Sequence, residues 1–152
     1  NETIENVVKI VSKCKLNAVQ LHGNESAEYV MKLRHSGLVS ESYPIEIFKA
    51  FSVDDNFDFS KTKVYENTCD YFLFDTKGKK YGGNGVKFNW DILKKYNGKT
   101  PFLLSGGISK NDVAEIQKIS HKAFVGIDIN SGFEIEPALK NIEDIKEFKQ
   151  NL

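Results

Sequence analysis

Three apolar runs in this chain each end on a polar step, and together they constrain the fold more than any other feature. The runs are Phe72-Leu73-Phe74-Asp75-Thr76, Phe102-Leu103-Leu104-Ser105-Gly106-Gly107 and Phe124-Val125-Gly126-Ile127-Asp128-Ile129-Asn130-Ser131-Gly132. A short run without polar alternation indicates a strand buried on both faces, as in a parallel sheet. Ligands of α/β folds bind at the carboxyl ends of such strands. Asp75 therefore places a carboxylate where chemistry is expected.

The strands belong to a repeated strand-helix pattern. Strand ends are predicted at intervals of 23 to 30 residues, at His22, Ala50, Asp75, Ser105 and Asp128. Helices are predicted at Thr3–Cys14, at Glu25–His35 after an Asn24 cap, at Asp54–Tyr65, at Trp90–Tyr96, after Ser109 through Ile119, and at Ile142–Phe148. This spacing fits either a doubly wound sheet or part of a (β/α)8 barrel.

A partial barrel is the favoured fold class. No Gly-x-Gly-x-x-Gly step opens a helix after the first strand, which argues against a dinucleotide-binding sheet. A TIM barrel needs eight strands, and this α/β chain supplies a leading helix and five βα units, so the first three strands are absent. We expect residues 1–152 to form a single domain of this kind.

Composition excludes several classes of protein. Lys plus Arg and Asp plus Glu are both 21, so no basic surface favours nucleic acid. No apolar segment suits a membrane span or a leader peptide, and we expect a soluble, cytoplasmic protein. Cys14 and Cys69 lack the spacing of a zinc site and are expected to be packing residues. Because the chain begins on Asn1 and a helix follows at once, we expect that preceding residues were lost by processing, disorder or truncation.

Two glycine-containing steps follow the last two strands. Glycines in Ser105-Gly106-Gly107-Ile108-Ser109 let backbone amides approach an anion, and Asn130-Ser131-Gly132 repeats the arrangement one unit later. Either loop by itself also suits a tight turn that requires a positive φ. Their occurrence as a pair favours a phosphate site, because the loops after the last two strands hold phosphate in many (β/α)8 barrels.

Other polar side chains are expected near these loops. A buried Asp75 could act as a general acid, or it could cap a turn. Asp128 could orient a sugar hydroxyl or cap the next turn. Gln20 and His22 point to one face of their strand, as lining residues or as a structural histidine. The Gly82-Gly83-Asn84-Gly85 segment is either a lid or a solvated loop.

Taken together, these blocks resemble phosphoribosylanthranilate isomerase over the whole chain. The matching blocks are Ala18-Val19-Gln20-Leu21-His22-Gly23, Phe74-Asp75-Thr76-Lys77, the segment Tyr81 to Trp90, Leu104-Ser105-Gly106-Gly107-Ile108 and the segment Ile127 to Glu134. The resemblance implies an Amadori rearrangement of N-(5-phosphoribosyl)anthranilate in tryptophan biosynthesis, without cofactor or metal. It also implies that Asp75 is the general acid, that Gly106, Gly107, Ser131 and Gly132 bind phosphate, and that Asp128 contacts the substrate.

One part of the family pattern is absent. The family's base is a cysteine in a Lys-x-Cys-Gly step after the first barrel strand, and neither Cys14 nor Cys69 aligns with it. Arg34, in a helix, does not match the family's arginine for the anthranilate carboxylate. Open edges at strands Ala18–His22 and Ala123–Asp128 should pair with a second copy or with a complementary N-terminal segment.

Two alternatives remain open. The chain could be a non-catalytic half-barrel that binds phosphate or assembles with a partner. It could also be a related sugar-phosphate enzyme such as indole-glycerol-phosphate synthase, which would use Lys49 and Glu46 at inner strand ends.

Overall fold

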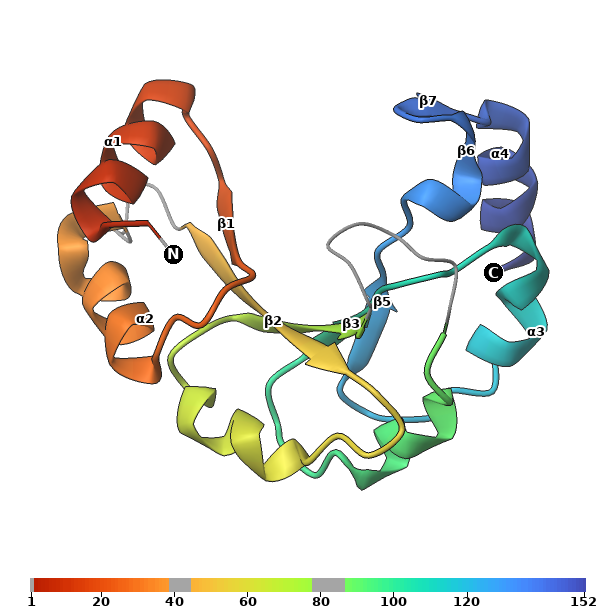
Figure 1. The fold of residues 1–152 in the computed structure, drawn as a ribbon, viewed down its shortest axis with the longest axis horizontal. Coiled ribbons are helices and arrows are strands. Elements are labelled where there is room, and N and C mark those ends of the chain that lie inside the picture. Colours follow the sequence, from red (N-terminus) through yellow and green to blue (C-terminus); the bar gives the residue numbers. More distant parts are fainter. Residues whose placement is uncertain (1, 39–44, 78–86) are drawn as a thin grey trace.

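The protein is built on a curved parallel sheet with helices along its outer side. The computed structural model describes residues 2–38, 45–77 and 87–152. Five parallel strands lie in the order β1-β2-β3-β4-β5 (Figure 1). Their bounds are β1 Ala18–Leu21, β2 Glu46–Val53, β3 Tyr71–Thr76, β4 Phe102–Leu104 and β5 Phe124–Ile127. The predicted repeat of parallel units is confirmed, and β1 and β5 form the two edges of the described sheet.

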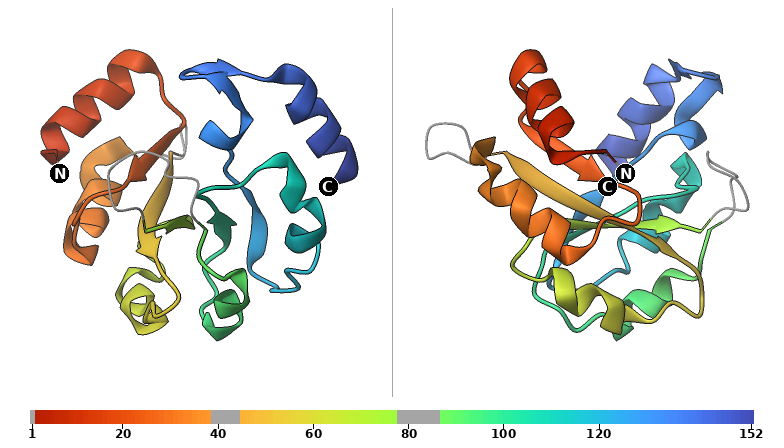
Figure 2. Two further views of the ribbon diagram at one scale, coloured as in Figure 1. Left: turned by 45° about the vertical axis from the view of Figure 1, so that its right-hand side comes forward. Right: turned by 60° about the vertical axis from the view of Figure 1, so that its left-hand side comes forward.

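The helices lie on the outer side of this curve, and the two ends of the chain form opposing arms (Figures 1 and 2). The α-helices are α1 Ile4–Cys14, α2 Ala27–Leu33, α3 Val113–Ile116 and α4 Ile142–Asn151. A π-helical turn, η1 Arg34–Leu38, follows α2, and 3-10 helices occupy η2 Phe59–Tyr65, η3 Trp90–Lys95, η4 Lys110–Asp112 and η5 Ser131–Phe133. A short antiparallel pair, β6 Glu134–Glu136 and β7 Leu139–Lys140, precedes α4.

Several predicted helix bounds are wrong. Helix α2 begins two residues later than predicted, and its cap is Ser26, whose Oγ accepts a hydrogen bond from the Tyr29 amide at 3.1 Å, not Asn24. The segment predicted as a helix over Asp54–Tyr65 is helical only from Phe59, because Asp58 caps it by accepting the Ser60 amide at 2.9 Å. The β6–β7 pair was not predicted, since its strands are only three and two residues long.

The main core lies between the outer face of the sheet and the helices. Phe72, Phe74, Phe102 and Leu104 alternate with inward residues along β3 and β4 and are fully buried. The ring of Tyr96, after η3, packs 5.4 Å from Phe74 and 5.5 Å from Phe102 between ring centroids. Each such aromatic residue contributes on the order of 1.5–3 kcal/mol of burial free energy, so this layer is a main source of the stability of the fold.

The two cysteines differ in burial. Cys69 is buried before β3, as predicted, whereas Cys14 is exposed, so the prediction that it packs in the core is wrong. Helix α1 packs against η1 and α2, and Val11 is its one buried residue, whereas Cys14 at its C-terminal end faces solvent. Among the described helices, none combines the length and the apolar character needed to cross a membrane.

Candidate active site

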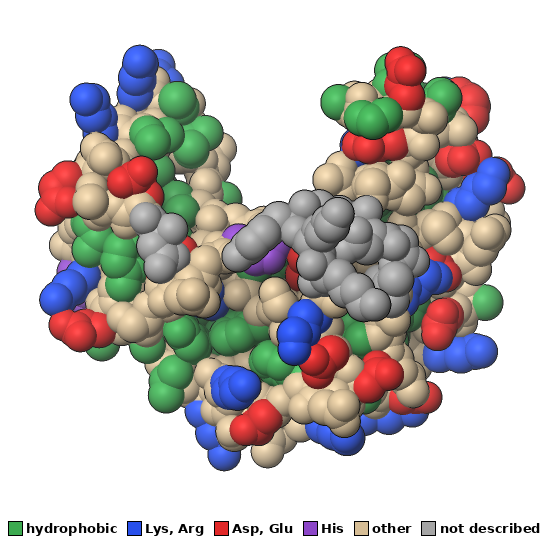
Figure 3. Space-filling model, viewed as in Figure 1, with side chains coloured by type: hydrophobic (Ala, Val, Ile, Leu, Met, Phe, Trp, Pro, Cys, Tyr) green, Lys and Arg blue, Asp and Glu red, His purple; other side chains and the backbone are tan. Residues whose placement is uncertain are grey.

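The inner face of the sheet is defined by the strand register. Gln20, Phe48 and Tyr71 lie side by side on β1, β2 and β3, and the rings of Phe48 and Tyr71 stack at 4.7 Å. Four residues further along β3, on the same face, Asp75 pairs in register with Ser52 and keeps a side chain that is 25% exposed. Asp75 therefore lies on the inner face at the carboxyl end, where the molecule is hollowed between its two arms (Figure 3).

We call the inner-face residues at the carboxyl ends of β1, β3, β4 and β5 the rim. On the rim, Nε2 of His22 lies 3.5 Å from Oδ2 of Asp75. Nδ1 of His22 lies 3.4 Å from the side-chain Nε2 of Gln20. The two ring nitrogens of His22 thus face two different side chains, Gln20 and Asp75. The structure thus brings together three of the residues that the sequence singled out.

The loop after β4 approaches the end of β3 closely. Gly106 and Gly107 have φ values of 89° and 69°, so the positive φ expected for a tight turn is present. A Cβ on Gly106 would lie 2.5 Å from the backbone nitrogen of Thr76, whose Oγ1 donates to the Gly106 carbonyl at 3.2 Å. The glycine is required because the Asp75–Thr76 end and the first predicted phosphate loop are in direct contact.

The second glycine loop packs against the first. A Cβ on Gly132 would lie 2.1 Å from the carbonyl oxygen of Ile108, so only glycine fits there. Ser105 Oγ donates to Oδ2 of Asp128 at 3.1 Å, which joins the ends of β4 and β5. Ser131 opens the short helix η5 beside Gly132. The sequence predicted two adjacent loops after the last two strands, and the structure places them in contact.

A buried carboxylate supports this loop region. Asp112 Oδ2 accepts the Ser109 amide at 2.7 Å and the Ser109 hydroxyl at 3.0 Å, while Oδ1 pairs with Lys87. Burial raises the pKa of Asp112, but the hydrogen bonds from Lys87 and Ser109 outweigh it and hold the pKa below its ordinary value. Sequence reasoning missed this contact, because Lys87 and Asp112 are 25 residues apart and nothing in the sequence marks the two side chains as partners.

The described residues do not place a thiolate beside Asp75. Cys69 precedes β3, at the amino end of the strand that carries Asp75 at its carboxyl end. Burial raises the pKa of Cys69 to about 11, so its thiol stays protonated near neutral pH. Among the described residues, no group of three or more His, Cys, Asp or Glu side chains is arranged to hold a metal ion. The predicted lid, Gly82-Gly83-Asn84-Gly85, lies outside the described residues.

Arg34 and Lys49 have partners away from the rim. Arg34 donates to Asp70 Oδ2 at 2.8 Å and to the Thr68 carbonyl at 3.0 Å, at the amino end of β3. Lys49 is 3% exposed and lies on the outer face, in register with Phe72. Glu46 begins β2 at the opposite end of the strand from the rim. The lysine and glutamate considered for an indole-glycerol-phosphate synthase are therefore not at inner carboxyl ends, and that prediction is wrong.

Comparison with known proteins decides the family. The sequence model described as N-(5'phosphoribosyl)anthranilate (PRA) isomerase matches residues 1–151. The chain belongs to this family. An N-(5'-phosphoribosyl)anthranilate isomerase of Parabacteroides distasonis is 47% identical over 152 residues, covering 100% of this chain and 66% of the relative. One of Phocaeicola vulgatus is 42% identical, covering 100% of this chain and 71% of the relative. The chain thus spans about two thirds of the length of these family members.

Solved structures of the family share the fold. Phosphoribosyl anthranilate isomerase from Thermus thermophilus superposes with a TM-score of 0.78 at 20% identity, over 99% of this chain and 68% of that one. A second isomerase, in complex with reduced 1-(o-carboxyphenylamino)-1-deoxyribulose 5-phosphate, gives a TM-score of 0.76 at 28% identity, over 99% of this chain and 66% of that one. The sheet described above is therefore a TIM-barrel-type arrangement with five of its strands present.

Proposed function

We propose that the protein acts as a phosphoribosylanthranilate isomerase in tryptophan biosynthesis. It converts N-(5-phosphoribosyl)anthranilate, an aminoaldose, into the 1-deoxyribulose 5-phosphate aminoketose, in the cytoplasm and without a cofactor. The observation that carries this proposal is the contact between the Asp75–Thr76 strand end and the Gly106 loop, which puts a carboxyl group next to a glycine-rich anion cradle. Membership of the isomerase family supports the same reaction.

Each rim residue has a role in this proposal. Asp75 protonates the furanose ring oxygen and opens the ring to a Schiff base. The amides of Gly106, Gly107, Ser131 and Gly132 bind the phosphate of the phosphosugar, because glycine lets the backbone approach an anion closely. Asp128 contacts a substrate hydroxyl, and Gln20 and His22 line the site beside Asp75.

The base and the barrel closure lie outside the described residues in this proposal. A cysteine supplied from another segment removes the proton from C2 of the ribose, since general acid-base catalysis here needs a group at each of two atoms. Residues 1–152 form one domain whose edges β1 and β5 pair with a complementary N-terminal segment or with a second copy. A non-catalytic phosphate-binding module would bind the substrate without turning it over.

An asparagine substitution at Asp75 tests the proposal. Asp75→Asn, made in the chain together with the segment that supplies the cysteine, should lower kcat by about 10²- to 10⁴-fold. This is the usual contribution of a positioned general acid. Asp54→Asn is the matched control, because Asp54 follows β2 at the same end of the sheet and pairs with Lys77, at 2.8 Å, and with the Asn56 amide of its own turn. Near-wild-type turnover by a folded Asp75→Asn protein would exclude Asp75 as the acid.

A further inference from the structure

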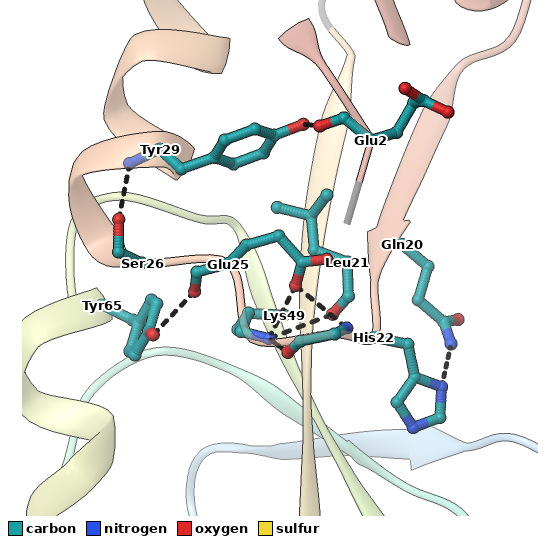
Figure 4. A network of polar contacts seen from close by, with 10 residues as sticks. Glu2, Gln20, Leu21, His22, Glu25, Ser26, Tyr29, Lys49 and Tyr65 are labelled. Carbon is teal, nitrogen blue, oxygen red and sulfur yellow. Dashed lines mark hydrogen bonds and ion pairs between the residues drawn. The ribbon is translucent and has the colours of Figure 1, made fainter. Parts of the chain in front are cut away.

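A buried lysine binds the backbone of the loop that carries His22. Lys49 Nζ lies 2.8 Å from the carbonyl oxygen of Gly23 and 3.4 Å from that of Leu21 (Figure 4). It also lies 3.1 Å from Oε2 of Glu25. The side chains of Lys49 and Glu25 are 4% and 6% exposed, so this is an ion pair almost without solvent. The same ammonium group therefore binds the backbone on both sides of His22.

Glu25 binds the same loop as well as Lys49. Its Oε2 accepts the backbone amide of Gly23 at 3.0 Å, and its backbone carbonyl accepts the hydroxyl of Tyr65 at 2.8 Å. Burial raises the pKa of Glu25, but the hydrogen bonds from its own amide, Lys49 and Gly23 outweigh it and leave the pKa below the ordinary value. The carboxylate is charged at neutral pH, and the loop from Leu21 to Ser26 is tied to β2 and η2.

The Lys49–Glu25 pair lies on the side of the sheet opposite the rim. Lys49 projects from the outer face of β2, where its ammonium lies 5.8 Å from the ring centroids of Phe51 and Tyr65. With the Leu21 and Gly23 carbonyls turned toward Lys49, the side chain of His22 lies on the other side of the loop, with Gln20 and Asp75. Figure 4 shows the imidazole next to Gln20 and apart from the Lys49–Glu25 pair.

Stability alone is a weak reason for a charge pair in such a place. Desolvating both ions costs about as much as their attraction returns, and apolar replacements of similar volume are often neutral or stabilising. A pair that also binds two specific carbonyls does something an apolar pair cannot do, since it fixes the path of the backbone. The residue whose path is fixed is His22.

We propose that Lys49 and Glu25 are positioning residues that hold the imidazole of His22 against the carboxyl group of Asp75. The catalytic meaning of this placement rests on the proposed function, in which Asp75 is the acid. Neither Lys49 nor Glu25 contacts the substrate, and both act through the Leu21–Gly23 backbone. The placement itself is a property of the folded chain and is measurable without turnover.

The test follows the ring resonances of the three histidines, His22, His35 and His121, by NMR at fixed pH. In the otherwise unchanged chain, Asp75→Asn should shift the ring signals of His22 strongly and leave those of His35 and His121 in place. In the double variant Lys49→Met/Glu25→Leu, the His22 response to Asp75→Asn should fall to the level of the other two histidines. Lys49→Arg, which keeps the charge and donors, should retain part of the response.

A matched control separates positioning from general loosening. Arg34→Met breaks a second ion pair, the partly exposed one with Asp70 at the opposite end of the sheet, and should leave the His22 response unchanged. If circular dichroism shows that Lys49→Met/Glu25→Leu does not fold, Lys49→Gln/Glu25→Gln takes its place with the same expectation. A full His22 response in the folded double variant overturns the proposal, as does its equal loss in Arg34→Met. Normal turnover by Asp75→Asn would contradict the proposed function and leave this NMR result standing.

Discussion

The two faces of the five-stranded sheet use the same strands for different purposes. On the outer face, Phe72, Phe74, Phe102 and Leu104 are completely buried under the helices. On the inner face, Phe48, Tyr71 and Asp75 stay partly exposed. Alternation along β3 therefore puts Phe72 and Phe74 in the core and Tyr71 and Asp75 on the opposite, more exposed face.

Lys49 and Asp75 make this separation concrete. Both are charged residues on neighbouring strands, but Lys49 lies on the outer face in the middle of β2 and Asp75 lies on the inner face at the carboxyl end of β3. Lys49 is buried in an ion pair with Glu25, whereas the half-exposed His22 is the ion-pair partner that Asp75 has within the described part of the chain. The charge of Lys49 is therefore neutralised inside the fold, whereas the carboxyl group of Asp75 remains accessible to a ligand.

The largest effect on stability is expected from the outer face. Phe74→Ala should lower the free energy of unfolding by about 3–5 kcal/mol, because it removes a completely buried ring from the main core. Phe48→Ala on the inner face should cost less, since it loses a partly exposed ring and one stacking contact of about 0.5–1.5 kcal/mol. Urea unfolding measures both, and equal losses would contradict the division between faces.

Glycine substitutions give an intermediate effect. Gly106→Ala should destabilise the protein by about 1–3 kcal/mol, because the residue has a φ of 89° and its new Cβ would meet Thr76. Gly126→Ala in β5 is the control, with 3.9 Å to the nearest atom, and it should be neutral or stabilising by about 0.4–1 kcal/mol. The thermal midpoint should fall for Gly106→Ala and should not fall for Gly126→Ala, and an equal decrease in both would count against the close contact at the rim.

The smallest effect on stability is expected from the acid titration of Asp112, the buried carboxylate that accepts hydrogen bonds from Ser109. The pKa of Asp112 is lower in the folded chain than its ordinary value of 3.8, so its stabilising contribution is present above that value. The contribution is lost as the pH falls through the folded-state pKa. Asp112→Asn should therefore lower stability at neutral pH and flatten its decline below about pH 4. Parallel acid-unfolding curves for the two proteins would show that the Lys87 and Ser109 bonds do not favour the charged form.

Sequence patterns predicted the parts of the fold that depend on local order. Apolar runs that end on polar steps located β3, β4 and β5, and the sequence order of the strands became their order in the sheet. The period of two also placed Gln20 and His22 on one face, opposite Leu21. These features follow from the geometry of single strands and from short connections.

Contacts between distant units were not predictable in the same way. The ion pair of Lys49 with Glu25 joins residues 24 positions apart, and no motif marks either side chain as a partner. The late start of η2 depended on the side chain of Asp58, and the exposure of Cys14 depended on how little of α1 is buried. Local periodicity carries no information about which side chains meet across the sheet.

The most direct test of a ligand site on the rim is binding of the analogue seen in a related isomerase, reduced 1-(o-carboxyphenylamino)-1-deoxyribulose 5-phosphate. Amide resonances of the chain, followed by NMR during titration, report which face is occupied. We predict that the amide resonances of Gly106, Gly107, Gly132 and Asp128 shift together. Those of Phe72 and Phe102, whose side chains lie on the outer face, should not shift. Shifts confined to the groove between η3 and α3, lined by Trp90, Leu93, Ile119 and His121, would contradict a phosphosugar site on the rim.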